Sequence, residues 1–158
     1  MRKFFLTLGY SGLSPKAPGT VGSFVALLIG LLLLQYISIT TLFLLALLIS
    51  VISVKQIDIY EKDVGVHDGS EIVIDELAGM WIALGIANAT ADNYIIAGLA
   101  FVYFRIFDIW KPSVIGKIDK DVKGGWGVMG DDMLAGLFAG LCTSMTYFLL
   151  LKYSVIPS

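Results

Sequence analysis

Residues 131–151 read DDMLAGLFAGLCTSMTYFLLL, two adjacent acids followed by a long apolar run. The same arrangement occurs earlier, where Asp75 and Glu76 precede the run LAGMWIALGIA at 77–87. An ionised side chain deep in a membrane costs at least ~2.5–3.5 kcal/mol, so charges are expected at the ends of apolar helices. Both stretches therefore predict helices that carry a pair of acids at their N-terminal ends.

Five apolar runs divide the chain: 24–37, 39–54, 77–87, 93–107 and 133–151. The chain is 57% hydrophobic and 15% charged, whereas a soluble domain carries roughly 25% charged residues. A straight membrane span needs about 20 apolar residues, so the shorter runs either cross with their ends in the headgroup zone or are re-entrant. We expect one all-α domain over 1–158, an integral membrane bundle of about four to five short transmembrane helices with a polar cytoplasmic face.

The charges are distributed unevenly about these runs. If each run crosses once, all acidic residues except Asp92 and all basic residues except Lys152 lie on one side. Basic loops remain in the cytoplasm, so this side is predicted to be cytoplasmic. The net charge of −2 suggests no nucleic-acid partner. The oligomeric state stays open, because Gly136 and Gly140 would permit close packing within or between chains.

The acidic pairs allow two interpretations. A single carboxylate at a helix N-terminus caps the helix and suits its dipole, but a second adjacent carboxylate repels the first. A hard cation relieves that repulsion, and Mg²⁺ binds carboxylate and phosphate oxygens. We therefore predict a magnesium site at Asp75, Glu76, Asp131 and Asp132, to which Glu71 adds a further carboxylate.

The remaining candidates near this site are more ambiguous. Asp68 and Glu71 either extend the acidic cluster or lie in a solvated turn around Gly69. His67 is either a general acid or base or an exposed turn residue. One histidine and one cysteine, Cys142, cannot supply a usual zinc ligand set.

Arg105, Asp108 and Lys111 follow one another at intervals of three residues, which places them on one helix face. Arg105 and Asp108 form either a structural ion pair or part of an anion site. Arginine grips phosphate with two parallel hydrogen bonds, so this face is a candidate phosphate site.

The stretch SPKAPGTVGS at 14–23 precedes the first apolar run. Its prolines stiffen it and its glycines allow the backbone to approach a ligand closely. Thr20 or Ser23 is expected to cap the helix that follows, and free N–H groups at a helix start bind phosphate readily. We expect Lys16 and Thr20 to assist phosphate binding.

Four stretches together resemble the phosphatidylglycerophosphatase A family: GLSPKAPGTVGS (12–23), VHDGSEIVIDELAGMWIAL (66–84), FRIFDIWKPSVIGKIDK (104–120) and GGWGVMGDDMLAGL (124–137). The resemblance implies a magnesium-dependent phosphatase of the bacterial inner membrane. Its substrate would be phosphatidylglycerophosphate, and its products would be phosphatidylglycerol and inorganic phosphate. The acidic positions of the family correspond here to Asp75, Glu76, Asp108, Asp131 and Asp132.

From these observations we expect catalytic roles for Asp75, Asp108 and Asp131, and substrate binding by Lys16, Thr20, Arg105 and Lys111. Phosphorus would be attacked either by water or by an aspartate that forms a phosphoenzyme. Two other functions are considered: an ion or solute carrier, which intramembrane charge often marks, and a non-catalytic membrane subunit with an acidic docking face. The carrier is disfavoured because no charge lies at the middle of any run.

Overall fold

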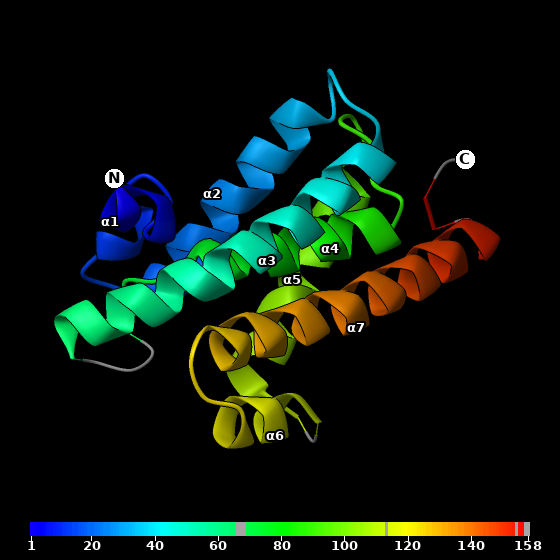
Figure 1. The fold of residues 1–158 in the computed structure, drawn as a ribbon. Helices are drawn as coiled ribbons and strands as arrows, with labels where there is room; N and C mark the ends of the chain where they lie inside the picture. The colour runs from blue at the N-terminus through cyan, green and yellow to red at the C-terminus, as the bar shows by residue number, and fades with distance from the viewer. Residues whose placement is uncertain (66–68, 113, 154, 157–158) are drawn as a thin grey trace.

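The computed structural model describes residues 1–65, 69–112, 114–153 and 155–156. These residues form seven α-helices and one 3₁₀ helix at Ser11–Leu13, with no strand among them (Figure 1). The helices are α1 (Arg2–Leu6), α2 (Pro18–Leu33), α3 (Ile39–Val64), α4 (Ile74–Ile86), α5 (Tyr94–Trp110), α6 (Val114–Asp121) and α7 (Gly125–Lys152). The prediction of an all-α fold is confirmed.

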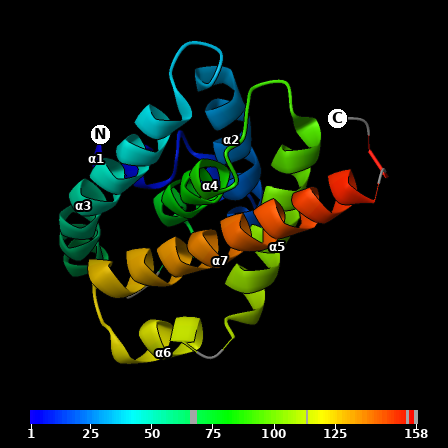
Figure 2. The same ribbon diagram turned by 90° about the vertical axis from the view of Figure 1, so that its right-hand side faces the viewer.

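Helix α4 lies at the centre of the bundle. Figure 2 shows it among α2, α3, α5 and α7, and it packs against all four. Every residue from Ile74 to Leu84 is buried, as expected for a segment that is apolar on all sides. Its 13 residues span about 20 Å, less than the ~30 Å of a bilayer core. The apolar run at 77–87 thus forms an internal helix that the other helices enclose.

Glycines allow α4 and α7 to meet backbone to backbone. A Cβ atom added to Gly136 would lie 2.2 Å from the carbonyl oxygen of Gly79, and one added to Gly79 would lie 2.6 Å from the carbonyl oxygen of Asp132. Small residues permit such an approach between apolar helices. Gly79 lies one turn after Asp75, and Gly136 lies one turn after Asp132, so this contact sets the distance between the acids.

The start of α7 differs from the prediction. Asp131 and Asp132 were expected at the N-terminal end of the last helix, but α6 lies at Val114–Asp121 and α7 already begins at Gly125. The carboxylate of Asp58 on α3 accepts a hydrogen bond from the Gly125 N–H at 2.7 Å. A Cβ on Gly125 would lie 2.2 Å from the Val54 carbonyl oxygen. The glycines therefore serve close packing against α3, and the two aspartates lie in the second turn of α7.

Two further helix ends bear on the site. Helix α2 begins at Pro18, a favoured first position, so Thr20 and Ser23 lie inside the helix and the prediction that either caps it is wrong. Helix α5 ends at Trp110, and Lys111 has a left-handed backbone with φ 43°. Pro112 follows directly and cannot continue the helix.

Two helices in the described part of the chain are long and apolar enough to cross a membrane, Ile39–Val64 and Gly125–Lys152. Helix α2 is apolar but shorter, and α4 is internal. The expected four to five membrane crossings are therefore not confirmed. Helix α3 also continues ten residues past the apolar run at 39–54 and carries the polar segment 55–64 toward the acidic end of α7.

The α4–α7 contact generates a stability prediction. Gly136→Ala would place a methyl group against the α4 backbone, and such overpacking typically costs about 1–3 kcal/mol. We expect a lower unfolding temperature for the detergent-solubilised protein, followed by circular dichroism. Gly98→Ala on α5 is the matched control, because a Cβ there meets nothing within 4 Å and alanine favours a helix over glycine. Equal unfolding temperatures for the two variants would contradict the contact.

Candidate active site

One polar pocket of about 260 Å³ lies where the ends of several helices meet. The N-terminal ends of α2 and α4, the C-terminal end of α5 and the first two turns of α7 contribute to its wall, together with Gly69, Ser70 and Ile72. Five acidic side chains line it: Asp75, Glu76, Asp108, Asp131 and Asp132. Acids that are up to 57 positions apart in the sequence thus share one cavity.

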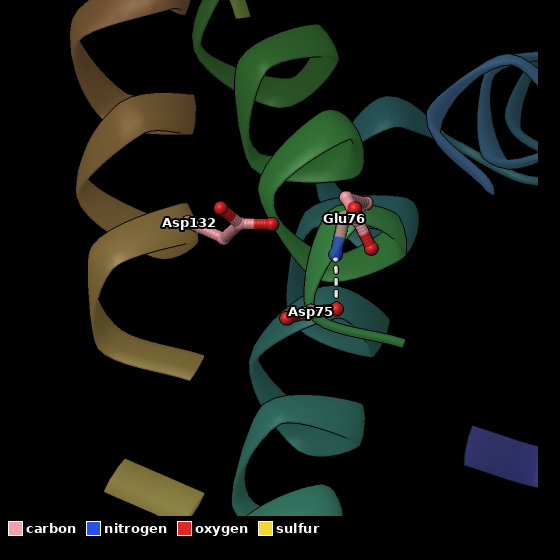
Figure 3. A group of neighbouring side chains, drawn as sticks. All are labelled: Asp75, Glu76 and Asp132. Carbon is pink, nitrogen blue, oxygen red and sulfur yellow. Dashed lines mark hydrogen bonds between the residues drawn. The ribbon is translucent and has the colours of Figure 1, made fainter. Parts of the chain in front are cut away.

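Asp75, Glu76 and Asp132 form the tightest part of this cluster. One oxygen of each carboxylate lies within 4.8 Å of the others, and Figure 3 shows Asp132 extending from α7 toward the first turn of α4. Glu76 Oε2 and Asp132 Oδ2 are buried and lack a hydrogen-bond partner. Buried acceptors without donors are costly, and three oxygens at this spacing can bind one cation. The residues therefore fit a metal ion with oxygen ligands.

The electrostatics of α4 agree with this fit. Burial raises the pKa of Asp75 well above its usual range, and the neighbouring Glu76 carboxylate raises it further. Burial, followed by the charge of Asp132, raises the pKa of Glu76 to about 8. Both effects disfavour the charged forms, and a cation bound among the three oxygens would favour them again.

Two basic side chains border the acids. Arg105 Nη1 lies 2.5 Å from Asp108 Oδ2 and 3.9 Å from Glu76 Oε1, and it donates to Ser23 Oγ at 3.1 Å. Lys111 Nζ lies 2.6 Å from Asp131 Oδ2. The structural ion pair that the spacing of Arg105 and Asp108 allowed is thus present, and it lies at the wall of the pocket.

The left-handed turn at Lys111 matters for this arrangement. On a regular helix the residue would continue the face of Arg105 and Asp108, and the turn instead directs its amine to α7. Arg105 therefore connects α5 to α2 and α4, and Lys111 connects the end of α5 to α7.

Helix α2 closes the pocket from another side. A Cβ on Gly19 would lie 2.3 Å from Glu76 Oε1 and 3.3 Å from Arg105 Nη1. Only glycine leaves room for these two side chains, so Gly19 brings the α2 backbone close to the protein's own charged groups. Pro18 and Gly19 line the pocket.

The structure places the other predicted residues farther out. Thr20 lies beside Arg105 in a separate, apolar groove. Lys16 is exposed, and its carbonyl oxygen accepts a hydrogen bond from Ser14. Glu71 accepts from the Tyr60 hydroxyl at 3.0 Å. Neither Lys16 nor Glu71 is among the described residues that line the pocket.

His67 and Asp68 lie outside the described residues. Ser23 is a contact that the sequence analysis missed, since it was considered only as a helix cap. Its place four residues after Gly19, on the same face of α2, was the available signal.

The fold and the pocket define an all-helical protein with a buried carboxylate site suited to a metal ion and bordered by an arginine and a lysine. A family model described as Phosphatidylglycerophosphatase A matches residues 4–147. The chain belongs to this family.

Named relatives agree with the family model. The chain is 42% identical to phosphatidylglycerophosphatase A of Escherichia coli over 85% of its length and 77% of that protein. It is 36% identical to the Haemophilus influenzae protein of the same name, over 85% of this chain and 82% of the relative. A Bacteroides thetaiotaomicron protein, provisionally named a phosphatidylinositol-3-phosphatase, is 40% identical over 82% of both chains. No solved structure matches the chain.

Metal binding can be measured without turnover. We expect Asp132→Asn to weaken Mn²⁺ binding, followed by electron paramagnetic resonance, by at least roughly tenfold. Loss of an outer-shell partner already costs about 10–100-fold, and Asp132 would be a direct ligand. Asp92→Asn removes an exposed acid outside the pocket and should leave the affinity unchanged. Equal affinities in both variants would place the cation elsewhere.

Proposed function

We propose that this protein removes the terminal phosphate of phosphatidylglycerophosphate with the help of Mg²⁺, and releases phosphatidylglycerol and inorganic phosphate. This is a step of phospholipid biosynthesis. The observation that carries the proposal is a pocket lined by five carboxylates and Lys111, with Arg105 paired to one of those carboxylates, in a chain that matches a phosphatase family along most of its length. Neither a solute carrier nor a docking subunit requires this combination.

Each charged residue has a distinct role in the proposal. Asp75, Glu76 and Asp132 would hold the cation, with Asp131 close by. A bound Mg²⁺ supplies positive charge that stabilises the transferring phosphoryl group. Arg105 would bind phosphate oxygens through its planar fork, Asp108 holds that fork in place, and Lys111 adds a second positive charge.

Hydrolysis forms a bond between a water oxygen and phosphorus and breaks the bond between phosphorus and the glycerol oxygen. The attacking water loses a proton, and the leaving oxygen gains one. Asp75, Asp108 and Asp131 are the carboxylates we propose for these proton transfers.

The location of the pocket suits a lipid substrate. We propose that the protein crosses the bacterial inner membrane several times, with α3 and α7 as full spans, and that the pocket opens to the cytoplasm. Basic residues concentrate at that end of the chain's predicted topology. The acyl chains would stay in the bilayer while the headgroup enters the pocket.

The first test is phosphate release in mixed micelles. We expect Mg²⁺-dependent release from phosphatidylglycerophosphate and loss of activity in EDTA, because the three carboxylates require a cation to act as ligands. Phosphatidylinositol 3-phosphate and phosphatidate serve as competing substrates. A higher kcat/KM on either competitor would reassign the substrate, and full activity in EDTA would remove the metal from the proposal.

Arg105→Lys tests the phosphate contact. Lysine keeps the charge but loses the fork, so we expect kcat/KM to fall about 10–100-fold, the loss of about 1.5–3 kcal/mol from a charged hydrogen bond. Arg2→Lys is the matched control, since Arg2 forms an ion pair with Asp63 away from the pocket. Wild-type kinetics for both variants would exclude bidentate binding by Arg105.

A further inference from the structure

A second cavity, of about 540 Å³, lies on the outer surface between α2 and α5. Its size is that of a small-molecule site, and its walls are almost entirely apolar. Its five apolar side chains all come from α5: Phe101, Val102, Ile106, Ile109 and Trp110. We call this cavity the α5 groove. It shares no acidic residue with the carboxylate pocket.

The α5 groove has two polar lining residues, Thr20 and Arg105. The same Arg105 contacts Asp108 and approaches Glu76 at the wall of the carboxylate pocket. Its Nε atom is buried and has no hydrogen-bond partner, which leaves a donor of a charged group unsatisfied. A single guanidinium therefore separates an apolar groove from an acidic cavity.

The groove follows the helix axis. Val102, Arg105 and Ile109 recur at helical spacing on one face of α5, and the lining from Phe101 to Trp110 extends about 13 Å at 1.5 Å per residue. Apolar lining residues lie on both sides of Arg105 along α5: Phe101 and Val102 precede it, and Ile106, Ile109 and Trp110 follow it.

We propose that the α5 groove holds an acyl chain of the phospholipid substrate, while Arg105, which lines the groove and contacts acids of the carboxylate pocket, binds the phosphate of the same lipid. This inference rests on the proposed function and adds to it the binding site for the hydrophobic part of the substrate. Arg105 carries the charge that a phosphomonoester lipid requires, whereas an apolar partner helix would leave its buried Nε donor without an acceptor.

The groove would orient the lipid more than it would increase affinity. Membrane lipid tails are as apolar as the side chains of the groove, so moving an acyl chain into it gains little. Fixing the chain beside Arg105 instead limits the positions that the phosphate can occupy. A displacement of about 1 Å can cost on the order of a hundredfold in rate.

Val102→Trp tests the groove, because the indole would fill it. The assay compares phosphatidylglycerophosphate that carries long acyl chains with a dibutyryl analogue that has the same headgroup. We expect the ratio of the two kcat/KM values, long chain over short, to fall by roughly tenfold or more. Val51→Trp makes the same change at an exposed position of α3 outside the groove and should keep the wild-type ratio.

A photoreactive lipid provides a second readout that does not depend on turnover. Phosphatidylglycerophosphate with a diazirine on one acyl chain should label α5 around Val102 and Ile106, and Val102→Trp should reduce that labelling while Val51→Trp should not. Labelling spread evenly over the exposed faces of α3, α5 and α7 would contradict the proposal that the α5 groove binds an acyl chain.

The outcomes separate the two proposals. If Val102→Trp keeps the wild-type turnover and the wild-type ratio of long-chain to short-chain kcat/KM, acyl-chain binding in the α5 groove is rejected and the proposed function stands. No phosphate release by the wild type from either substrate rejects the proposed function, and the labelling pattern then decides on the groove by itself.

Discussion

The site depends on the contact between the backbones of α4 and α7. Gly79 and Gly136 let the two helices touch, and one turn away the same geometry brings Asp75 toward Asp132. A side chain at either glycine would separate the helices by the width of a methyl group or more. Because α4 is enclosed on all sides, no other helix could shift to compensate, so the spacing of the acidic oxygens is built into the packing of the core.

The clustering of carboxylates destabilises the folded protein around the pocket. Carboxylates from two helices lie together in a buried pocket, and burial and mutual repulsion both disfavour their charged forms. Ion pairs from α5 offset part of that repulsion, through Arg105 at one side and Lys111 at the other. The apolar contacts around α4 hold the acids in place despite their repulsion, as in many sites where function and stability conflict.

Much of this could be predicted from the sequence. In a chain with so few charges, each acid beside an apolar run was a candidate ligand, and Asp75, Glu76, Asp108, Asp131 and Asp132 do line one pocket. Hydropathy also predicted the helices. It could not distinguish the enclosed α4 from a lipid-facing span, because both are apolar on every side. Nor could local glycine content show that Gly124 and Gly125 begin a helix, since the deciding contacts come from Val54 and Asp58 on α3.

The ion pairs at the pocket wall have a consequence for selectivity. Arg105 and Lys111 each already contact a carboxylate, so an incoming ligand must compete with an anion for them. A phosphomonoester carries nearly two negative charges at neutral pH, with a second pKa near ~6, and offers three terminal oxygens. The diester headgroups of bulk membrane lipids carry one charge at phosphorus and should compete poorly. The pre-formed ion pairs would thus reduce competitive inhibition of the enzyme by the phosphodiester lipids that surround it.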